Sequence, residues 1–379
     1  MSSSALERCV GDTAAFLENR WGRRSLHVPA SRDHGDLIAP ADFDALIARS
    51  LLPSAAFRLV RDGSPIPERI YTRKFGGRRA EQLLVADPTL VWDEFYGGAT
   101  IVLEGLHKYW SPLTEFCRRL ESDLGHPTQV NAYITPPGSQ GFARHVDVHD
   151  VFVLQIHGEK LWEVADEVGS DDLQPVHLRA GDTLYVPTDC AHSARTSGQP
   201  SIHLTVGVLV QTWGDVISDL FDMAKSDPVF AERLPVERDR QPGSVESLAK
   251  EASRRMQEWF EDLDPETVEA RLRRRLLTNR HERNEGRLVQ LLALPGLNDS
   301  TSIDRIQEGE ATRSGATITL LLDDRELQLP DTVREALDFV LARDAFVVEE
   351  LQHYLDEPGR LAFVGRLIRE GLLAARLES

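Results

Sequence analysis

The sequence predicts an α+β protein in which a β-rich barrel or jelly roll is followed by a helical region and a small mixed module. Short apolar runs punctuated by glycine and proline fill residues 98–210, which favours a barrel or jelly roll over alternating β-α units. Helical patterns dominate 215–280. Beyond residue 287, short helices with a hairpin indicate a winged-helix-like module. The predicted domains are therefore 1–214, 215–286 and 287–379.

Composition is ordinary for a soluble globular protein, with 41% hydrophobic and 27% charged residues in 379. No apolar run approaches the roughly 20 residues needed to span a bilayer, and no secretory signal is visible. The net charge of −18 repels DNA unless a local basic face overrides it. Cys9, Cys117 and Cys190 form neither a zinc pattern nor a disulfide framework. We therefore expect a cytoplasmic protein with no DNA or membrane partner.

The residues before the barrel are expected to be largely helical. Helical patterns cover 6–19 and 42–49, and another covers 113–124, where Gly125 and Pro127 end it. A strand is predicted at 98–103. The barrel strands proper are then expected at 129–135, 151–156, 160–164, 182–186 and 203–210. The strands 151–156 and 160–164 are predicted to form a hairpin around Gly158.

The residues after the barrel are expected to form helices and one hairpin. Helices are predicted at 215–225, 245–262 and 265–280, and again at 332–342, 347–355 and 361–370. The hairpin is predicted from strands 317–322 and 326–329.

The first chemical signal is His145-Val146-Asp147. The i, i+2 spacing places His145 and Asp147 on one face of a β-strand. A histidine and a carboxylate on one face are two thirds of the facial triad that holds non-haem Fe(II) and leaves positions open for a cosubstrate and oxygen. By itself such a triplet is usually incidental, so the hypothesis needs a second histidine.

That histidine is predicted to be His192, delivered by a loop after the strand that Pro187 ends. Gly181, Pro187 and His192 have the spacing of the second motif of cupins, with Asp189 where cupins usually have glycine. His203, within an apolar strand, and His149, further along the strand of His145, are rival ligands.

Lys160 is the third signal, fifteen residues after His145. In a small barrel its side chain can point inward. A buried lysine requires a partner charge, and a dicarboxylate cosubstrate would supply one. The alternative is an exposed lysine on an edge strand.

Residues 133–147, YITPPGSQGFARHVD, and residues 151–162, VFVLQIHGEKLW, closely resemble the JmjC-type ribosomal oxygenases of the cupin superfamily. The resemblance covers residues 99–210 well and the later layout more loosely. It implies a double-stranded β-helix, the cupin or JmjC jelly roll, and a protein hydroxylase that depends on Fe(II), 2-oxoglutarate and O2.

By this resemblance His145, Asp147 and His192 bind iron, and Lys160 pairs with the distal carboxylate of 2-oxoglutarate. Asn131 and Tyr133 contact cosubstrate and substrate, and Thr205 also lines the pocket. The family layout further implies a homodimer through the helices after residue 215, and a C-terminal winged helix. A cationic protein or peptide, with a ribosomal protein as the family default, is the predicted substrate. The stretch 144–200 agrees, since it has ten acidic residues against four Lys and Arg.

Several alternatives remain open. A shortened segment between Asp166 and Leu178 would also suit a tailoring oxygenase for a peptide natural product. A histone demethylase fits less well, because the lead-in residues resemble hydroxylases, and Asp147 argues against a halogenase. From other classes, the chain could be a non-catalytic metal-binding scaffold or a zinc or manganese cupin isomerase. The module from Pro330 on has ten acidic and six basic residues, so it is predicted to pack or recruit partners without binding DNA.

Overall fold

The computed structural model describes most of the chain and divides it into two compact units. The described residues are 4–30, 33–49, 51–76, 83–139, 143–234, 244–265, 267–269, 271–272, 286–322 and 325–376. The first unit spans Met1–Val210 and the second Gln211–Ser379. The further division at 286/287 stays a prediction.

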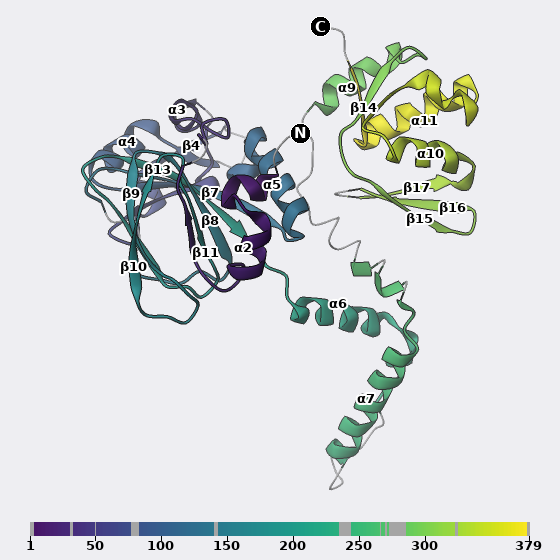
Figure 1. Cartoon of the computed structure of the whole chain (residues 1–379), viewed down its shortest axis with the longest axis horizontal. Helices are drawn as coiled ribbons and strands as arrows, with labels where there is room; N and C mark the ends of the chain where they lie inside the picture. Colours follow the sequence, from purple (N-terminus) through teal and green to yellow (C-terminus); the bar gives the residue numbers. More distant parts are fainter. Residues whose placement is uncertain are drawn as a thin grey trace. The chain divides into compact units, whose positions relative to one another are not determined.

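Helices of the first unit cover one face of a large sheet (Figure 1). They are α1 (Ala5–Val10), α2 (Thr13–Asn19), α3 (Pro40–Arg49), α4 (Pro88–Tyr96) and α5 (Ser111–Leu124). The prediction of one helix over 6–19 is wrong, because Gly11 leaves the helix with φ 73° and the Asp12 side chain caps a new one. The helix predicted at 113–124 is confirmed, and Gly125 ends it in the left-handed conformation.

The large sheet is antiparallel and has the strand order β1-β11-β8-β13-β7-β6-β2-β3. Its strands are β1 (Leu26–Val28), β2 (Phe57–Arg61), β3 (Ser64–Pro65), β6 (Thr100–Leu103), β7 (Thr128–Thr135), β8 (Asp150–His157), β11 (Thr183–Val186) and β13 (Ser201–Val208). Val130, Ala132 and Ile134 of β7 join the core beneath the helices. Because side chains alternate along a strand, Asn131 and Tyr133 lie on the opposite, inner face.

A second sheet of three strands has the order β10-β9-β12 and packs against that inner face. It contains β9 (Glu159–Ala165), β10 (Leu173–Arg179) and β12 (His192–Thr196). Side chains from β8 and β11 share a core with side chains from β9 and β10. This is the two-sheet jelly roll that the glycine and proline punctuation predicted.

The predicted hairpin around Gly158 is wrong. β8 pairs with β11 and β13, whereas β9 pairs with β10 and β12, so the chain changes sheets at this turn. Gly158 adopts φ +65°, and a Cβ there would lie 2.0 Å from the carbonyl oxygen of Pro200. Turn residues in the sequence indicate where a strand ends, but the pairing partner depends on the packing of both sheets.

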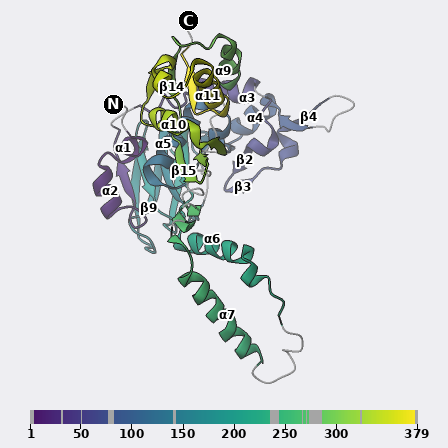
Figure 2. The same ribbon diagram turned by 90° about the vertical axis from the view of Figure 1, so that its right-hand side faces the viewer.

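A separate two-stranded hairpin, β4 (Thr72–Phe75) with β5 (Leu83–Ala86), extends from the first unit (Figure 2). Its base is fixed to the barrel, since Ala86 N–H donates to the Leu52 carbonyl at 2.8 Å and the Tyr71 ring contacts Phe57 edge-on at 5.3 Å between ring centres.

The second unit begins with two helices, α6 (Trp213–Ser226) and α7 (Ser244–Glu261), close to the predicted ranges. A reciprocal capping box between Thr212 and Asp215 starts α6. The helix predicted at 265–280 lies largely outside the described residues.

The C-terminal part of the second unit has its own hydrophobic core. Its main elements are α9 (Arg287–Ala293), β14 (Ser302–Arg305), β15 (Glu310–Ser314), β16 (Thr317–Leu321), β17 (Glu326–Pro330), α10 (Arg334–Leu341), β18 (Ala345–Val347), α11 (Glu357–Glu370) and β19 (Leu373–Ala375). The predicted hairpin is confirmed as β16 with β17. The helix predicted at 347–355 is present over Val348–His353, where it is a 3-10 helix that follows the last residue of β18.

Two predictions about the whole chain can be compared with these elements. No helix among the described ranges is both long enough and apolar enough to cross a membrane. Cys9, Cys117 and Cys190 are free and buried, as expected from their spacing.

Candidate metal centre and its cavity

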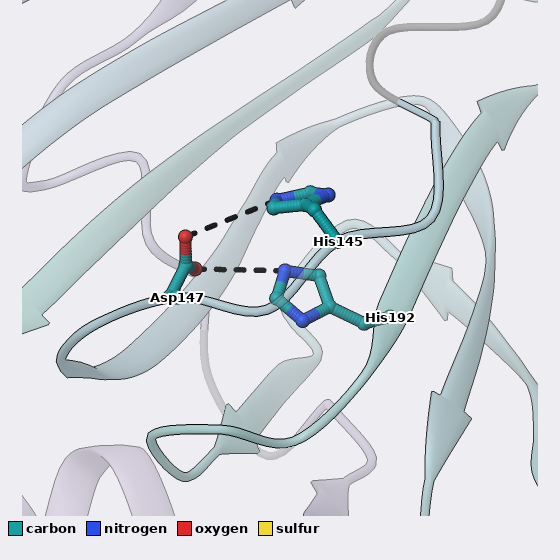
Figure 3. Close-up of side chains that lie close together, drawn as sticks. All are labelled: His145, Asp147 and His192. Carbon is teal, nitrogen blue, oxygen red and sulfur yellow. Dashed lines mark ion pairs between the residues drawn. The ribbon is translucent and has the colours of Figure 1, made fainter. Parts of the chain in front are cut away.

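Three side chains converge at one end of the jelly roll: His145, Asp147 and His192 (Figure 3). One ligand atom from each lies within 4.8 Å of the others. The Asp147 carboxylate faces both rings from one side, with Oδ1 3.8 Å from His145 Nε2 and Oδ2 3.5 Å from His192 Nε2 (Figure 3). These separations are longer than ordinary hydrogen bonds, and they suit donor atoms that share one ion.

The spacing of His145 and Asp147 predicted that both lie on a regular strand. This prediction is wrong. The two residues lie in the irregular segment before β8, where His145 forms an isolated antiparallel bridge with His192. The His145 amide donates to the His192 carbonyl at 3.0 Å, and the His192 amide returns a bond of 2.9 Å. His192 is also the first residue of β12 and not a loop residue. Backbone pairing therefore brings the two imidazoles together.

Asp189 explains why cupins usually have glycine at its position. Its φ is +61°, a conformation that favours glycine but that a short polar residue such as aspartate tolerates. In this conformation its amide donates to the Asp147 carbonyl at 3.1 Å. The departure from the motif therefore leaves the turn intact.

Both histidines have Nδ1 engaged with the backbone carbonyl two residues earlier. His145 Nδ1 lies 2.8 Å from the Ala143 oxygen, and His192 Nδ1 lies 3.0 Å from the Cys190 oxygen. Since a carbonyl only accepts, each proton is assigned to Nδ1 and each Nε2 keeps its lone pair. This is the second-sphere arrangement typical of metal-binding histidines.

Burial lowers the pKa of His192, which favours the neutral imidazole that a metal requires. The three side chains differ in exposure, from 39% for His145 to 4% for His192. A bound ion would therefore have one face in protein and one face toward the opening. The residues present fit a two-histidine, one-carboxylate site with open positions.

The candidate ligands lie in a cavity of about 210 Å³ between the two sheets. The large sheet contributes Tyr133, Val151, Val153, His203 and Thr205, and the small sheet contributes Lys160, Trp162, His192 and Ala194. Apolar and aromatic walls with a few polar groups are typical of small-molecule sites.

Lys160 is buried in this cavity, with 3% of its surface exposed, and is not an exposed edge lysine. Its Nζ lies 3.3 Å from Thr135 Oγ1 and 5.9 Å from the centre of the Trp162 ring. None of the ion pairs between described residues includes Lys160, and burial lowers its pKa to about 7. A buried ammonium without a carboxylate fits an anionic ligand.

The two rival histidines have other environments. The His203 ring stacks on Tyr133 at 4.9 Å between ring centres, and its buried Nδ1 has no hydrogen-bond partner. The His149 ring packs against Gly207, and its Nε2 lies 3.4 Å from Gln129 Nε2. Neither belongs to the cluster of three.

The remaining predicted site residues separate into two groups. Tyr133 and Thr205 line the cavity. Asn131 lies opposite Thr205 in the strand register, but its Oδ1 accepts the Gly105 amide at 2.9 Å, and the described lining of the cavity does not include it.

Sequence reasoning missed Trp162 and Arg58 as lining residues. Trp162 could have been found, because it is two residues from Lys160 on the same strand and therefore shares its face. Arg58 lies on β2, and no strand was predicted there.

Fold and site together define the class: a cupin-type double-stranded β-helix with a His-Asp-His metal-binding candidate. Residues 107–216 match the JmjC domain family. The chain therefore contains a JmjC domain, as its sequence motifs indicated.

Curated relatives match the same region. The chain is 33% identical over 159 residues to the bifunctional lysine-specific demethylase and histidyl-hydroxylase NO66 of Dictyostelium discoideum, covering 37% of this chain and 31% of the relative. It is 28% identical over 267 residues to ribosomal oxygenase 1 of Gallus gallus, covering 63% of this chain and 43% of the relative. The chain spans less than half the length of these relatives.

Solved structures extend the likeness to nearly the whole chain. YcfD, a ribosomal oxygenase from Escherichia coli, matches with a TM-score of 0.58 and 19% identity over 97% of this chain and 98% of that one. A structure of YcfD with cobalt and 2-oxoglutarate matches with a TM-score of 0.57 and 18% identity over 96% and 98%. At this identity the likeness establishes the fold.

Proposed function

We propose that the protein is an Fe(II)- and 2-oxoglutarate-dependent oxygenase that hydroxylates a side chain of a protein, with a ribosomal protein as the expected target. The proposal rests on the presence, in one cavity, of the cluster His145, Asp147 and His192 together with a buried lysine that has no acidic partner among the described residues.

In this proposal His145, Asp147 and His192 hold Fe(II), which when bound supplies oxygen activation at its open positions. The backbone carbonyls of Ala143 and Cys190 keep both rings oriented with Nε2 toward the ion. Val151, Val153 and Trp162 surround the site with apolar surface and restrict water.

Lys160 is assigned to the distal carboxylate of 2-oxoglutarate. Forming that ion pair compensates the charge that burial makes costly. Tyr133 and Thr205 line the same cavity and are proposed to contact the cosubstrate or the target side chain. A contact by Asn131 stays a prediction, since its amide oxygen is already used by Gly105.

A cationic target follows from charge. Ten acidic residues against four basic ones in 144–200 make the sequence around the site acidic, which attracts a basic partner. The name ribosomal oxygenase 1 points to a ribosomal target, and the name histidyl-hydroxylase points to a histidine side chain. A peptide natural product would be oxidised by the same chemistry and is the alternative target.

The finer features of the family layout are proposals as well. A homodimer through the helical region is supported by Trp213, Ile217 and Phe221, which recur every four residues on α6 and are 81%, 46% and 43% exposed. The winged-helix character of the C-terminal part and a cytoplasmic location stay predictions.

The test has two parts. Purified protein with Fe(II), 2-oxoglutarate and O2 should form succinate, and Lys160→Ala should raise the 2-oxoglutarate requirement steeply while leaving metal binding largely intact. Lys250→Ala, on an exposed face of α7, is the matched control. Unchanged cosubstrate dependence in Lys160→Ala would disprove the role of that residue.

The target is identified by intact-protein mass spectrometry of ribosomal proteins from source cells with and without the gene. A gene-dependent gain of one oxygen on one protein supports both reaction and target. If succinate forms in vitro but no ribosomal protein changes, the peptide alternative replaces the ribosomal one.

A further inference from the structure

The hairpin β4–β5 concentrates positive charge in a strongly acidic chain. Residues 72–86, from the start of β4 to the end of β5, contain four Lys and Arg and one Glu, whereas the whole chain has 43 basic and 61 acidic residues. Arg69, Arg73 and Lys74 are exposed. No ion pair formed between described residues includes any of the three. Within the described part of the chain, these three charges are therefore exposed and have no acidic partner.

Two large apolar side chains lie among these cations. Phe75 is 44% exposed and Leu83 is 61% exposed, and the two are directly opposite each other in the β4–β5 register. A hairpin that served only to keep the surface soluble would not leave an aromatic and a leucine exposed at this point. The combination of exposed cations with an exposed ring is typical of surfaces that bind single-stranded nucleic acid.

The cations lie on both faces of β4, which suits a flexible chain that can pass over the hairpin better than a flat partner. Arg73 and Phe75 are on one face of β4 and Lys74 is on the other, because side chains alternate. The two strands of this hairpin form a separate two-stranded sheet. The base of the hairpin is held at two points, by the backbone bridge between Pro53 and Val85 and by the contact between the Tyr71 and Phe57 rings. Phe57 directly precedes Arg58, which lines the cavity. The hairpin is thus anchored to the first unit at β2, the strand that carries Arg58.

We propose that the β4–β5 hairpin and the turn before it bind single-stranded RNA, with Arg73 and Lys74 of β4 and Arg69 of the turn on phosphates and Phe75 on a base. The preference for RNA over DNA rests on the proposed function, because a ribosomal-protein target is found together with RNA. The contact would hold the enzyme beside its target without reading sequence.

The experiment is fluorescence anisotropy with a labelled uridine oligomer of about 20 nucleotides, on full-length protein with metal removed. We expect a Kd of about 1–100 µM at physiological salt. With three phosphate contacts, log K should fall with log salt with a slope of about −2. The double variant Arg73→Glu/Lys74→Glu should weaken binding at least about tenfold and reduce the slope toward −0.7. Phe75→Ala should weaken it about fivefold or more with the slope unchanged.

A matched control separates local from overall charge. Arg233→Glu/Arg369→Glu makes the same change in net charge at exposed residues of the second unit and should leave both affinity and slope unchanged. Circular dichroism of each variant verifies folding, which these exposed positions should not disturb.

Four results would overturn the proposal. The first two are that the wild type does not bind the uridine oligomer at about 100 µM, or that Arg73→Glu/Lys74→Glu does not weaken binding. The other two are that the equivalent deoxythymidine oligomer binds more tightly, or that Arg73→Glu/Lys74→Glu converts a dimer to a monomer. The last would show that the hairpin contacts a second, acidic copy of the chain. Succinate formation is measured separately, so a negative RNA result leaves the oxygenase proposal standing, and the reverse also holds.

Discussion

Replacing Lys160 by methionine is expected to stabilise the ligand-free protein and, at the same time, to remove its response to 2-oxoglutarate. In the free protein Lys160 is 3% exposed and forms no ion pair with a described carboxylate. Methionine keeps the unbranched stem that packs beside Trp162 and deletes only the charge. The substitution should therefore raise the stability of the ligand-free protein and weaken the binding of 2-oxoglutarate. The reason is that the lysine charge is proposed to have its partner in the ligand and not in the folded protein.

The size of the first effect follows from the pKa. Burial lowers the pKa of Lys160 from 10.5 to about 7, and a change of one in a pKa corresponds to about 1.4 kcal/mol. The buried ammonium therefore costs about 5 kcal/mol, an upper bound because lysine stems relax toward water. A gain of about 2–4 kcal/mol in the unfolding free energy of Lys160→Met at pH 6 is the realistic expectation.

The pH dependence has a definite sign. Below pH 7 the lysine is charged in both states and the full cost is present. Between pH 7 and 10.5 the folded state loses its proton first, so the unfolded state binds more protons and the wild type gains stability as pH rises. The advantage of Lys160→Met should therefore shrink between pH 6 and pH 9, by at most about 3 kcal/mol.

The assay is urea unfolding of metal-free protein at both pH values, compared with Lys250→Met as control. Lys250 is exposed on α7 and pairs with Glu246, so its replacement should change stability by less than about 0.5 kcal/mol at either pH. With Co(II) and 2-oxoglutarate added, the wild type should gain about 2.7 kcal/mol at a hundredfold excess of ligand over Kd. Lys160→Met should bind the cosubstrate at least about 100-fold more weakly.

Two results would refute this reasoning. If Lys160→Met is less stable than the wild type at pH 6, the ammonium has a compensating partner in the free protein. If it is more stable yet keeps the wild-type response to 2-oxoglutarate, the lysine is an unpaired buried charge with no role in cosubstrate binding.

Three further outcomes are expected. His145→Ala should weaken Co(II) binding at least about 100-fold and abolish succinate formation; calorimetry that shows unchanged binding would contradict the ligand assignment. Gly158→Ala should lower the free energy of unfolding by at least about 3 kcal/mol, because the new Cβ meets the Pro200 carbonyl. Gly125 is also left-handed but has open space around it, so Gly125→Ala should lower the free energy of unfolding by only about 1–2 kcal/mol. Equal melting temperatures of the two variants would refute the steric argument. Burial lowers the pKa of His34 to about 4, so the unfolded state takes up a proton first as the pH falls from 6.5 to 4. Over this range the free energy of unfolding of the wild type should fall by about 3 kcal/mol more than that of His34→Gln. Parallel plots of unfolding free energy against pH for the two proteins would contradict this.

Local patterns in the sequence were enough for much of the molecule. The spacing of glycine and proline indicated a barrel or jelly roll, and the helix at 111–124 and the β16–β17 hairpin follow from short-range rules of capping and alternation. The candidate ligands were found the same way, since the HxD triplet and the histidine after Pro187 are each defined by neighbours along the chain.

Only the tertiary structure decided how these pieces meet. Alternation along a strand suggested that His145 and Asp147 share a face, but a backbone bridge to His192 aligns the site. The change of sheet at Gly158 depends on Pro200, which is distant in sequence. Burial of Lys160 likewise requires two sheets that the sequence does not show to be stacked. Such long-range pairings depend on packing energies summed over the whole core, and no window of neighbouring residues contains them.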